Sequence, residues 1–307
     1  MFQRLLYRIL FISWYLLSLL PFWILYYISD ILYFPLFYLV RYRRKVVEKS
    51  LSECFPDKSP SERLKIEKQF YHFFCDYVLE TIKLFSISRK SMMKRMEFCG
   101  AEELMADLKQ KNKKLCFVYL GHYCNWEYVA SLQYWLPDAH CGQIYHRIYN
   151  KEFDELFLKL RGQFGGESIL MSNTLRRILT LRKEAQPSVI GFIADQLPKW
   201  ENMGHWTHFL NHETSFFTGA ERIGKQIDAA FYFLQVERVK RGHYKATFRK
   251  ITSDPKEHPD FDITDIYARM LEEQIRKAPQ FWLWTHKRWK RTKEEWLKKQ
   301  NKGEHEN

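Results

Sequence analysis

The sequence lacks the cysteine patterns of small secreted domains and of zinc sites. Its six cysteines, at positions 54, 75, 99, 116, 124 and 141, form no C-x-x-C pair, so they fit neither a disulfide framework nor a zinc ribbon or finger. Glycine and proline are scarce, with 12 and 10 in 307 residues, which excludes collagen-like and low-complexity chains. We therefore expect mostly buried free thiols in a reducing compartment.

Negative charge is also in short supply. The sequence has 36 Asp and Glu residues and 49 Lys and Arg residues, which gives a formal net charge of +13. Such an excess points to an anionic partner, and a membrane surface, a nucleic acid and an acidic protein all remain open. With 46% hydrophobic and 17% aromatic residues the chain is not disordered, and its length suits one large α/β domain or two small ones.

Charged side chains are absent from residues 9–28. About twenty helical residues cover the roughly 30 Å hydrocarbon core of a bilayer. Pro21 interrupts the run and favours a kinked or interfacial arrangement over a straight span. A second apolar run, residues 31–40, is too short to cross alone. We predict an uncleaved membrane anchor in residues 1–45; the alternative is a buried core helix of a soluble protein.

Basic residues flank this anchor unequally. Arg4 and Arg8 precede it, whereas Arg41, Arg43, Arg44 and Lys45 follow it. Basic residues remain preferentially on the cytoplasmic side of bacterial membranes. We therefore predict that the large C-terminal part lies on the cytoplasmic face of the cell inner membrane.

The rest of the chain alternates strand and helix patterns. Apolar residues at steps of three and four predict an amphipathic helix over 63–85, started by the Ser-Pro-Ser-Glu at 59–62. Apolar runs predict strands at 115–120, 188–194, 230–237 and 243–251. Helices are expected near 125–134, 151–161, 174–183, 216–226 and 263–277. Because no clear linker follows residue 45, residues 46–307 are predicted to form one layered α/β domain.

A histidine and a carboxylate stand just after the first of these strands, at His122 and Glu127. On one continuous helix, residues five apart diverge by about 140°. If His122 instead lies on the turn before a helix, Glu127 can reach back to one imidazole nitrogen and leave the other as a general base. The helix start also offers unpaired backbone N–H groups to a developing oxyanion. A chance spacing of the two residues is the alternative.

These residues begin a series of motifs that resembles the bacterial lipid A biosynthesis acyltransferases, the lauroyl and myristoyl transferases of the glycerolipid acyltransferase superfamily. The family's His-x4-Asp/Glu motif is similar to residues 121–127, and further likenesses follow in order at residues 145–147, 160–161, 193–196, 208–210, 218–219 and 281–289. The chain departs from the family pattern at Cys124, at Lys287 in place of an arginine, and at Leu210-Asn211, which lack the usual glycine. The fold implied by the resemblance is a central mixed sheet flanked by helices.

The activity implied by the resemblance is transfer of a fatty acyl chain from an acyl carrier protein thioester to a hydroxyl of a lipid A precursor. His122 would act as general base and Glu127 would support its imidazolium, with no cofactor and no metal. The same chemistry on another acceptor, such as an amino lipid or a pigment precursor, stays open. A non-enzymatic basic membrane protein that binds nucleic acid is the third hypothesis, but no RNP, KH or zinc-finger pattern supports it, so we expect no nucleic-acid partner.

Further site candidates have plainer alternatives. We predict that Arg161 and, more weakly, Arg147 stabilise an oxyanion or bind an acceptor phosphate, and that Asp195 orients Arg161 or a loop; an exposed helix charge and a turn residue are the alternatives. Phe216 and Phe217 line an acyl pocket or simply belong to the core.

Two further groups of residues invite a ligand interpretation. The trio His205, His208 and His212 has spacing unsuited to a metal. The basic, tryptophan-containing tail 287–307 suits a headgroup surface, an acidic carrier protein or substrate phosphates, or forms a solvated helix face.

Overall fold

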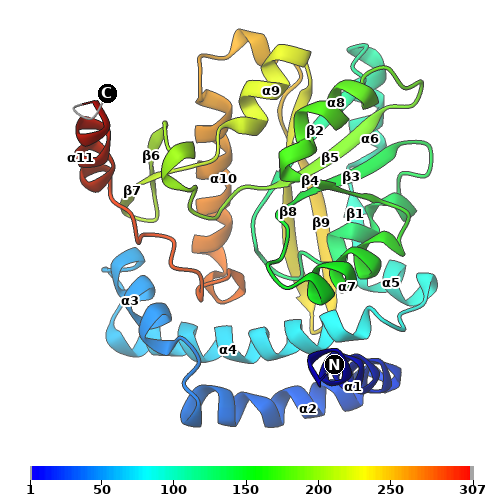
Figure 1. The fold of residues 1–307 in the computed structure, drawn as a ribbon, viewed down its shortest axis with the longest axis vertical. Coiled ribbons are helices and arrows are strands. Elements are labelled where there is room, and N and C mark those ends of the chain that lie inside the picture. The colour runs from blue at the N-terminus through cyan, green and yellow to red at the C-terminus, as the bar shows by residue number, and fades with distance from the viewer. Residues whose placement is uncertain (1, 305–307) are drawn as a thin grey trace.

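The computed structural model describes residues 2–304 of the chain, which form an α/β fold with a central sheet flanked by helices (Figure 1). The α-helices are α1 (Phe2–Leu19), α2 (Phe22–Phe34), α3 (Arg44–Cys54), α4 (Pro60–Lys83), α5 (Arg89–Arg95), α6 (Ala101–Gln110), α7 (Lys151–Gly162), α8 (Thr174–Leu181), α9 (Gly219–Ile227), α10 (Asp262–Lys277) and α11 (Lys293–Glu304). The strands are β1 (Met96–Cys99), β2 (Leu115–Leu120), β3 (His140–Tyr145), β4 (Glu167–Leu170), β5 (Ser188–Ile193), β6 (Trp206–Phe209), β7 (His212–Ser215), β8 (Ala230–Lys240) and β9 (His243–Thr252). Short helical turns are η1 (Pro35–Leu39), η2 (Tyr128–Tyr134), η3 (Met171–Asn173), η4 (Trp200–Asn202), η5 (Pro255–Glu257) and η6 (Pro279–Phe281).

The central sheet has the strand order β1-β9-β8-β2-β5-β3-β4. Its neighbours pair in parallel except for the antiparallel hairpin β8–β9, so the predicted mixed sheet is confirmed. Every residue of β2 is buried, as expected for a central strand covered on both faces. On one face Tyr119 stacks on Tyr267 of α10, with ring centroids 4.5 Å apart, whereas Val118 and Leu120 point to the side covered by η2.

Long periodic segments agree with the sequence analysis. Helix α4 begins at the expected Ser-Pro-Ser-Glu, where Ser59 and Glu62 form a capping box and each satisfies a backbone N–H of the other. The strand at 115–120 has the predicted bounds. The helix expected at 125–134 is wrong in type and extent, because only the 3-10 turn η2 forms there. The side chain of Asn125 accepts the backbone N–H of Tyr128 at 3.2 Å, so the chain turns before it becomes helical.

The N-terminal apolar region is interrupted at Pro21, as predicted. The helix breaks there into α1 and α2, because proline lacks the N–H that would continue the hydrogen-bond ladder. By length and composition, the stretch Phe22–Leu39 is apolar enough to cross a membrane, which is weak evidence for a membrane anchor. The side chains of Arg4 and Arg8, which bear on its orientation, lie outside the described residues.

Helix α4 separates two layers of the molecule. Helices α1 and α2 lie below it in Figure 1, and the sheet with the remaining helices lies above it. Its buried residues face both ways: Leu79 and Ile82 pack with Leu25 of α2, whereas Phe73 packs into the main core.

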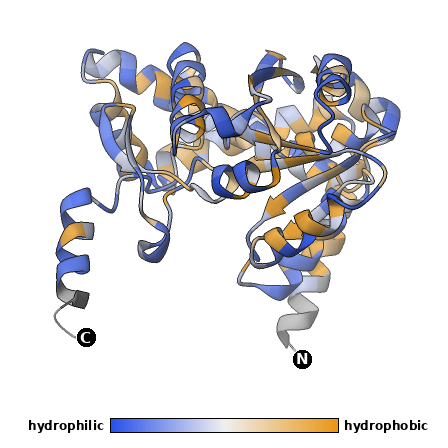
Figure 2. Cartoon of the chain, turned by 90° about the horizontal axis from the view of Figure 1, so that it is seen from above, coloured by the Kyte–Doolittle hydropathy of each residue, from blue (hydrophilic) through white to orange (hydrophobic). Residues whose placement is uncertain are grey.

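The C-terminal helix α11 projects from the body of the molecule and is almost wholly hydrophilic (Figure 2).

Candidate functional site

The candidate site lies where two parallel strands end side by side. In the pairing of β2 with β5, Leu120 is opposite Ile193. Two residues further along each strand come His122 and Asp195, so the two side chains meet at the carboxyl edge of the sheet, where open α/β sheets bind ligands. Gly121 allows α10 to pack closely against the end of β2, because a Cβ atom at this position would lie 2.7 Å from Leu271 Cδ1.

Asp195 holds both the ring and the backbone of His122. Its Oδ1 lies 2.6 Å from His122 Nδ1, and its Oδ2 accepts the backbone N–H of His122 at 2.9 Å. Burial alone would raise the pKa of Asp195, but the opposing charge and hydrogen bonds of His122 and the Trp282 indole together lower it. An ionised carboxylate accepts only, so Nδ1 carries a proton and Nε2 presents a lone pair. Of the two predicted roles of Asp195, the contact with a loop backbone is present at His122, whereas Arg161 binds Glu127 instead.

A C-terminal segment holds this corner of the site in place. The indole Nε1 of Trp282 donates to Asp195 Oδ2 at 2.8 Å. The same residue forms an antiparallel bridge with Tyr123. Flanking backbone bonds run from Cys124 N to Phe281 O at 2.9 Å and from Leu283 N to the His122 carbonyl at 3.1 Å. No spacing in the sequence assigns this role to Trp282, because its partner is 87 residues away.

The first three backbone N–H groups of the turn that begins at His122 already have acceptors. Cys124 adopts a positive φ of 52°, which bends the chain sharply. The N–H groups of residues 122, 123 and 124 bind Asp195, Gly121 O and Phe281 O respectively. These three groups are therefore not free to bind an oxyanion, and the oxyanion role of the N–H groups that follow them in the turn stays a prediction. Burial raises the pKa of the Cys124 thiol well above its usual value, so this fully buried side chain is no nucleophile.

Glu127 faces away from the imidazole that it was predicted to orient. Arg161 of α7 binds both of its carboxylate oxygens, Nε to Oε2 at 2.8 Å and Nη2 to Oε1 at 2.7 Å. The Glu127 side chain is 4% exposed and that of Arg161 20% exposed. Burial alone would lower the pKa of Arg161, but the Glu127 charge raises it. The predicted contact between Glu127 and His122 is therefore wrong, because the bend at Cys124 directs the carboxylate toward α7.

The free nitrogen of His122 has polar and aromatic neighbours. The amide Nε2 of Gln196 lies 3.4 Å from His122 Nε2. Trp126 meets the imidazole edge-on, with ring centroids 5.1 Å apart, and stacks on Tyr77 of α4 at 4.2 Å. The side chain of His122 is 19% exposed, so it is shielded without being sealed from solvent.

His286 and Arg288 belong to the same C-terminal segment. Burial lowers the pKa of His286 to about 4, and the positive charges of Arg288 and Lys290 act in the same direction. The Nε2 atom of His286 accepts the backbone N–H of Leu197 at 3.4 Å. Arg288 is fully buried and donates to Thr214 Oγ1 and Ser215 O at 2.6 and 2.7 Å. Burial also lowers the pKa of Arg288 to about 10.

The remaining predicted residues lie apart from His122. Arg147 is exposed, and its ion-pair partner is Asp154, 3.9 Å away. Phe216 is fully buried with its ring against Phe209 and under the Arg288 guanidinium. Phe217 is partly buried against the same core. The acyl-pocket role of both phenylalanines stays a prediction.

The three clustered histidines have separate partners. His205 binds Asp265 at 2.7 Å and His212 lies 3.5 Å from Glu53, whereas His208 is exposed. Within residues 2–304, no three His, Cys, Asp or Glu side chains gather closely enough to hold a metal ion.

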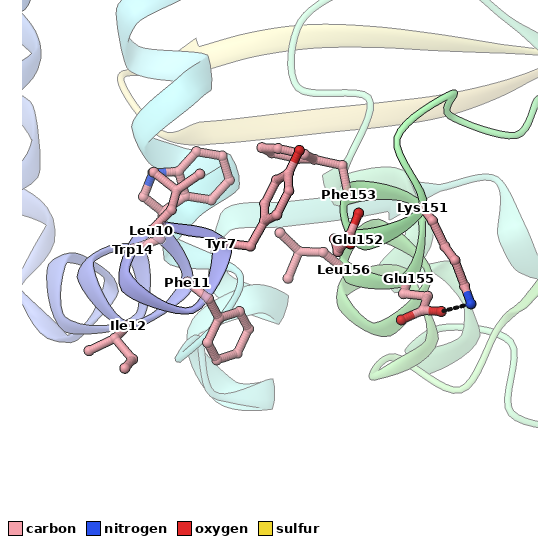
Figure 3. Close-up of a pocket in the computed structure, with 10 residues that line it drawn as sticks. All are labelled: Tyr7, Leu10, Phe11, Ile12, Trp14, Lys151, Glu152, Phe153, Glu155 and Leu156. Carbon is pink, nitrogen blue, oxygen red and sulfur yellow. Dashed lines mark ion pairs between the residues drawn. The ribbon is translucent and has the colours of Figure 1, made fainter. Parts of the chain in front are cut away.

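Two cavities lie near these elements. A groove of about 590 Å³ runs between α1 and α7. Figure 3 shows apolar and aromatic side chains from α1 on one side and Phe153 and Leu156, with the Lys151–Glu155 ion pair, on the other. A small cavity of about 50 Å³ lies against the sheet beneath Trp126, lined by Val118, Leu120 and Ile193. The ring of Trp126 lines this cavity and also contacts the imidazole of His122.

A histidine held by a carboxylate at a sheet edge is an arrangement that can serve general-base chemistry. The model of the family described as bacterial lipid A biosynthesis acyltransferase matches residues 2–291 of the chain. The chain therefore belongs to this family, and the resemblance seen in its motifs is confirmed. No curated protein matches the sequence. Membership supports an acyltransferase of lipid A biosynthesis with a lipid acceptor.

Proposed function

We propose that the protein transfers a fatty acyl chain from an acyl carrier protein thioester to a hydroxyl group of a lipid A precursor. Family membership supports the reaction class and the lipid acceptor. The observation that carries the mechanism is the 2.6 Å contact between His122 Nδ1 and Asp195 Oδ1. It fixes the tautomer in which the other imidazole nitrogen is free to take a proton.

The proposed reaction needs no covalent enzyme intermediate. His122 Nε2 removes the proton from the acceptor hydroxyl as its oxygen attacks the thioester carbon. The tetrahedral intermediate then collapses, the carbon–sulfur bond breaks, and the imidazolium returns the proton to the leaving thiolate. The Asp195 carboxylate stabilises the imidazolium while it exists. The products are the ester and the free carrier thiol.

In this proposal side chains contribute to oxyanion stabilisation together with the backbone N–H groups of the turn that have no partner. The Gln196 amide lies beside His122 Nε2 and offers an N–H donor at the point where the reacting groups meet. Arg161 uses Nε and Nη2 to bind Glu127, so its other N–H groups are available for an oxyanion or an acceptor phosphate. Glu127 acts through Arg161 by fixing the guanidinium, and Arg147 is a second candidate for the acceptor phosphate.

The setting of the reaction is the cytoplasmic face of the inner membrane. Both substrates fit this place: the carrier protein is soluble, whereas the acceptor lies in the bilayer. The apolar layer of α1 and α2 and the positive net charge support an anionic lipid surface. The basic tail from residue 287 suits the acidic carrier protein.

The test is a purified His122→Ala protein assayed with radiolabelled acyl carrier protein and extracted membrane lipids. We expect the acylation rate to fall by about 10² to 10⁴. The control is His208→Ala, which removes an exposed histidine and should leave the rate unchanged. An unchanged rate in His122→Ala would remove His122 as the base.

The acceptor is identified separately. Mass spectrometry of lipids from a deletion strain should show a lipid A species that lacks one acyl chain. A lighter amino lipid or pigment instead would keep the mechanism and replace the acceptor.

A further inference from the structure

We propose that α1, α2 and η1 embed in a single leaflet of a lipid bilayer, with both helix axes parallel to the membrane plane, and that neither helix crosses it. This inference deepens the proposed function, because it defines the surface from which a lipid acceptor is taken. Its test reads topology and binding, so it fails independently of the enzyme assay.

One face of α2 is held by polar bonds to the body of the protein. The Ser29 hydroxyl donates to Asp76 of α4 at 2.7 Å. Asp30 pairs with Arg241, from the turn between β8 and β9, at 2.7 Å, and the same guanidinium binds Asp76 at 2.6 Å. A helix crossing the bilayer would have to expose Ser29 and Asp30 to hydrocarbon without these partners.

The junction between α1 and α2 is held in the same way. The Lys83 ammonium, at the end of α4, donates to the carbonyl oxygens of Ser18 and Leu20 at 2.5 and 2.9 Å. Ser86 donates to the Ser18 carbonyl at 2.5 Å. The break at Pro21 is therefore bonded to the protein body, and it is not the tip of a hairpin that extends into the bilayer.

The outer faces of both helices are apolar and exposed. On α2 the exposed residues recur at steps of four and three: Trp23 (72%), Tyr27 (66%), Ile31 (54%) and Phe34 (57%). On α1 the corresponding residues are Ile9 (56%), Ile12 (55%), Leu16 (59%) and Leu19 (52%). Each helix thus has one continuous apolar stripe and one face against the body, which is the pattern of an interfacial helix.

The arrangement of the two helices makes these stripes one surface. In Figure 1 α2 is seen from the side and α1 nearly along its axis, and both lie in one layer beneath α4. The groove between α1 and α7 reaches the exposed ring of Phe11 and side chain of Ile12, so a lipid chain from the leaflet can enter it (Figure 3). The exposed Arg41 and Lys45 follow η1, at the depth of anionic headgroups.

The site lies one helix layer away from this surface. Tyr77 of α4 stacks on Trp126, which contacts His122. Packed helix axes are about 8–10 Å apart. A lipid hydroxyl raised slightly above the leaflet would therefore reach the site without leaving the membrane.

The first test determines which side of the membrane each part faces. The full chain, with one epitope before Met1 and another after Asn307, is examined by protease treatment of inverted and right-side-out membrane vesicles. We expect both epitopes to be cleaved in the inverted vesicles only. Cleavage of the N-terminal epitope from the opposite side would overturn the proposal. A Leu19→Cys variant distinguishes a hairpin, because labelling by an impermeant maleimide from the far side would also overturn it.

The second test measures binding to vesicles of equal parts phosphatidylethanolamine and phosphatidylglycerol. Ile31→Glu places a charge in the apolar stripe and should weaken binding by about tenfold or more. The matched control is Leu175→Glu on α8, a residue of similar exposure (47%) outside the layer, which should bind as the wild type does. Equal binding of both variants would contradict the embedding of α2.

Discussion

Two buried carboxylates bind side chains at the two ends of the loop from His122 to Glu127. At one end, which we call the imidazole side, Asp195 binds the ring and the backbone N–H of His122. On the guanidinium side, Glu127 binds Arg161, whose charge does not titrate. The difference separates two kinds of pair at one turn: the first holds the imidazole to which we assign proton transfer, and the second holds a permanent charge in place.

The largest expected effect comes from a substitution that disrupts the contact between Asp195 and His122. Asp195→Asn keeps the shape of the side chain but no longer fixes the proton on His122 Nδ1, so kcat should fall by about 10³ to 10⁴. Steady-state rates with labelled acyl carrier protein measure it. The matched control is Asp265→Asn, which alters the pair of Asp265 with His205 and should leave kcat within a few-fold. A similar rate in Asp195→Asn would show that His122 needs no oriented tautomer.

The next largest effect is a loss of folding stability when the pair of Glu127 and Arg161 is broken. Arg161→Met leaves the buried Glu127 carboxylate without its partner and should lower the free energy of unfolding by about 3–5 kcal/mol. Denaturant titration in detergent measures it. Arg177→Met, which removes a more exposed ion pair with Glu167, should cost less than about 1 kcal/mol.

A double variant then separates structure from catalysis. Glu127→Met combined with Arg161→Met should recover part of the stability, because no unpaired charge remains. If Arg161 also contacts the substrate, the acylation rate should stay low in this variant. Full recovery of the rate would limit the pair to a structural role.

The sequence predicts where the strands of the site lie, but not which side chains meet at their ends. The strands at 115–120 and 188–193 are visible as apolar runs, so the edge that carries His122 and Asp195 could be located. That these strands are adjacent and parallel is a tertiary fact, and it decides which carboxylate meets the imidazole. The bend at Cys124 has no sequence signal either, since its positive φ is set by surrounding contacts. Local spacing therefore favoured Glu127, and the long-range pairing overruled it.

The N-terminal region shows the same limit. Its apolar composition and the break at Pro21 follow from the sequence. The polar anchors of α2 do not, because Asp76 and Arg241 are distant in the chain and look like ordinary surface charges.

A smaller effect concerns the surroundings of the imidazole side. The pKa of His286 is lowered from 6.5 to about 4, mainly by burial. Its neutral form is favoured in the folded state, so stability is fully present above pH 6.5 and is lost as pH falls toward 4. At about 1.4 kcal/mol per unit of pKa shift, the full loss should be about 3 kcal/mol. His286→Gln should flatten this dependence in denaturant midpoints measured at pH 7 and pH 4.5, whereas the exposed His208→Gln should not. An unchanged slope in His286→Gln would mean that another group carries the acid sensitivity.

The smallest expected effect tests whether the hydrogen bond from Trp282 to Asp195 influences the pH dependence of the reaction. Trp282→Phe removes the indole donor from Asp195 and leaves more negative charge facing His122. The protonated imidazole is then favoured, so the acid limb of the kcat/KM profile should move to higher pH by up to about one unit, equivalent to tenfold in rate at low pH. Trp284→Phe is the matched control, because it removes a buried indole donor from the same segment, bonded to Pro279 O at 2.6 Å. Both variants should lose similar stability, and only Trp282→Phe should shift the profile. Equal pH profiles for the two variants would mean that Trp282 only supports the fold. The pH dependence of kcat/KM would then not depend on the hydrogen bond from Trp282 to Asp195.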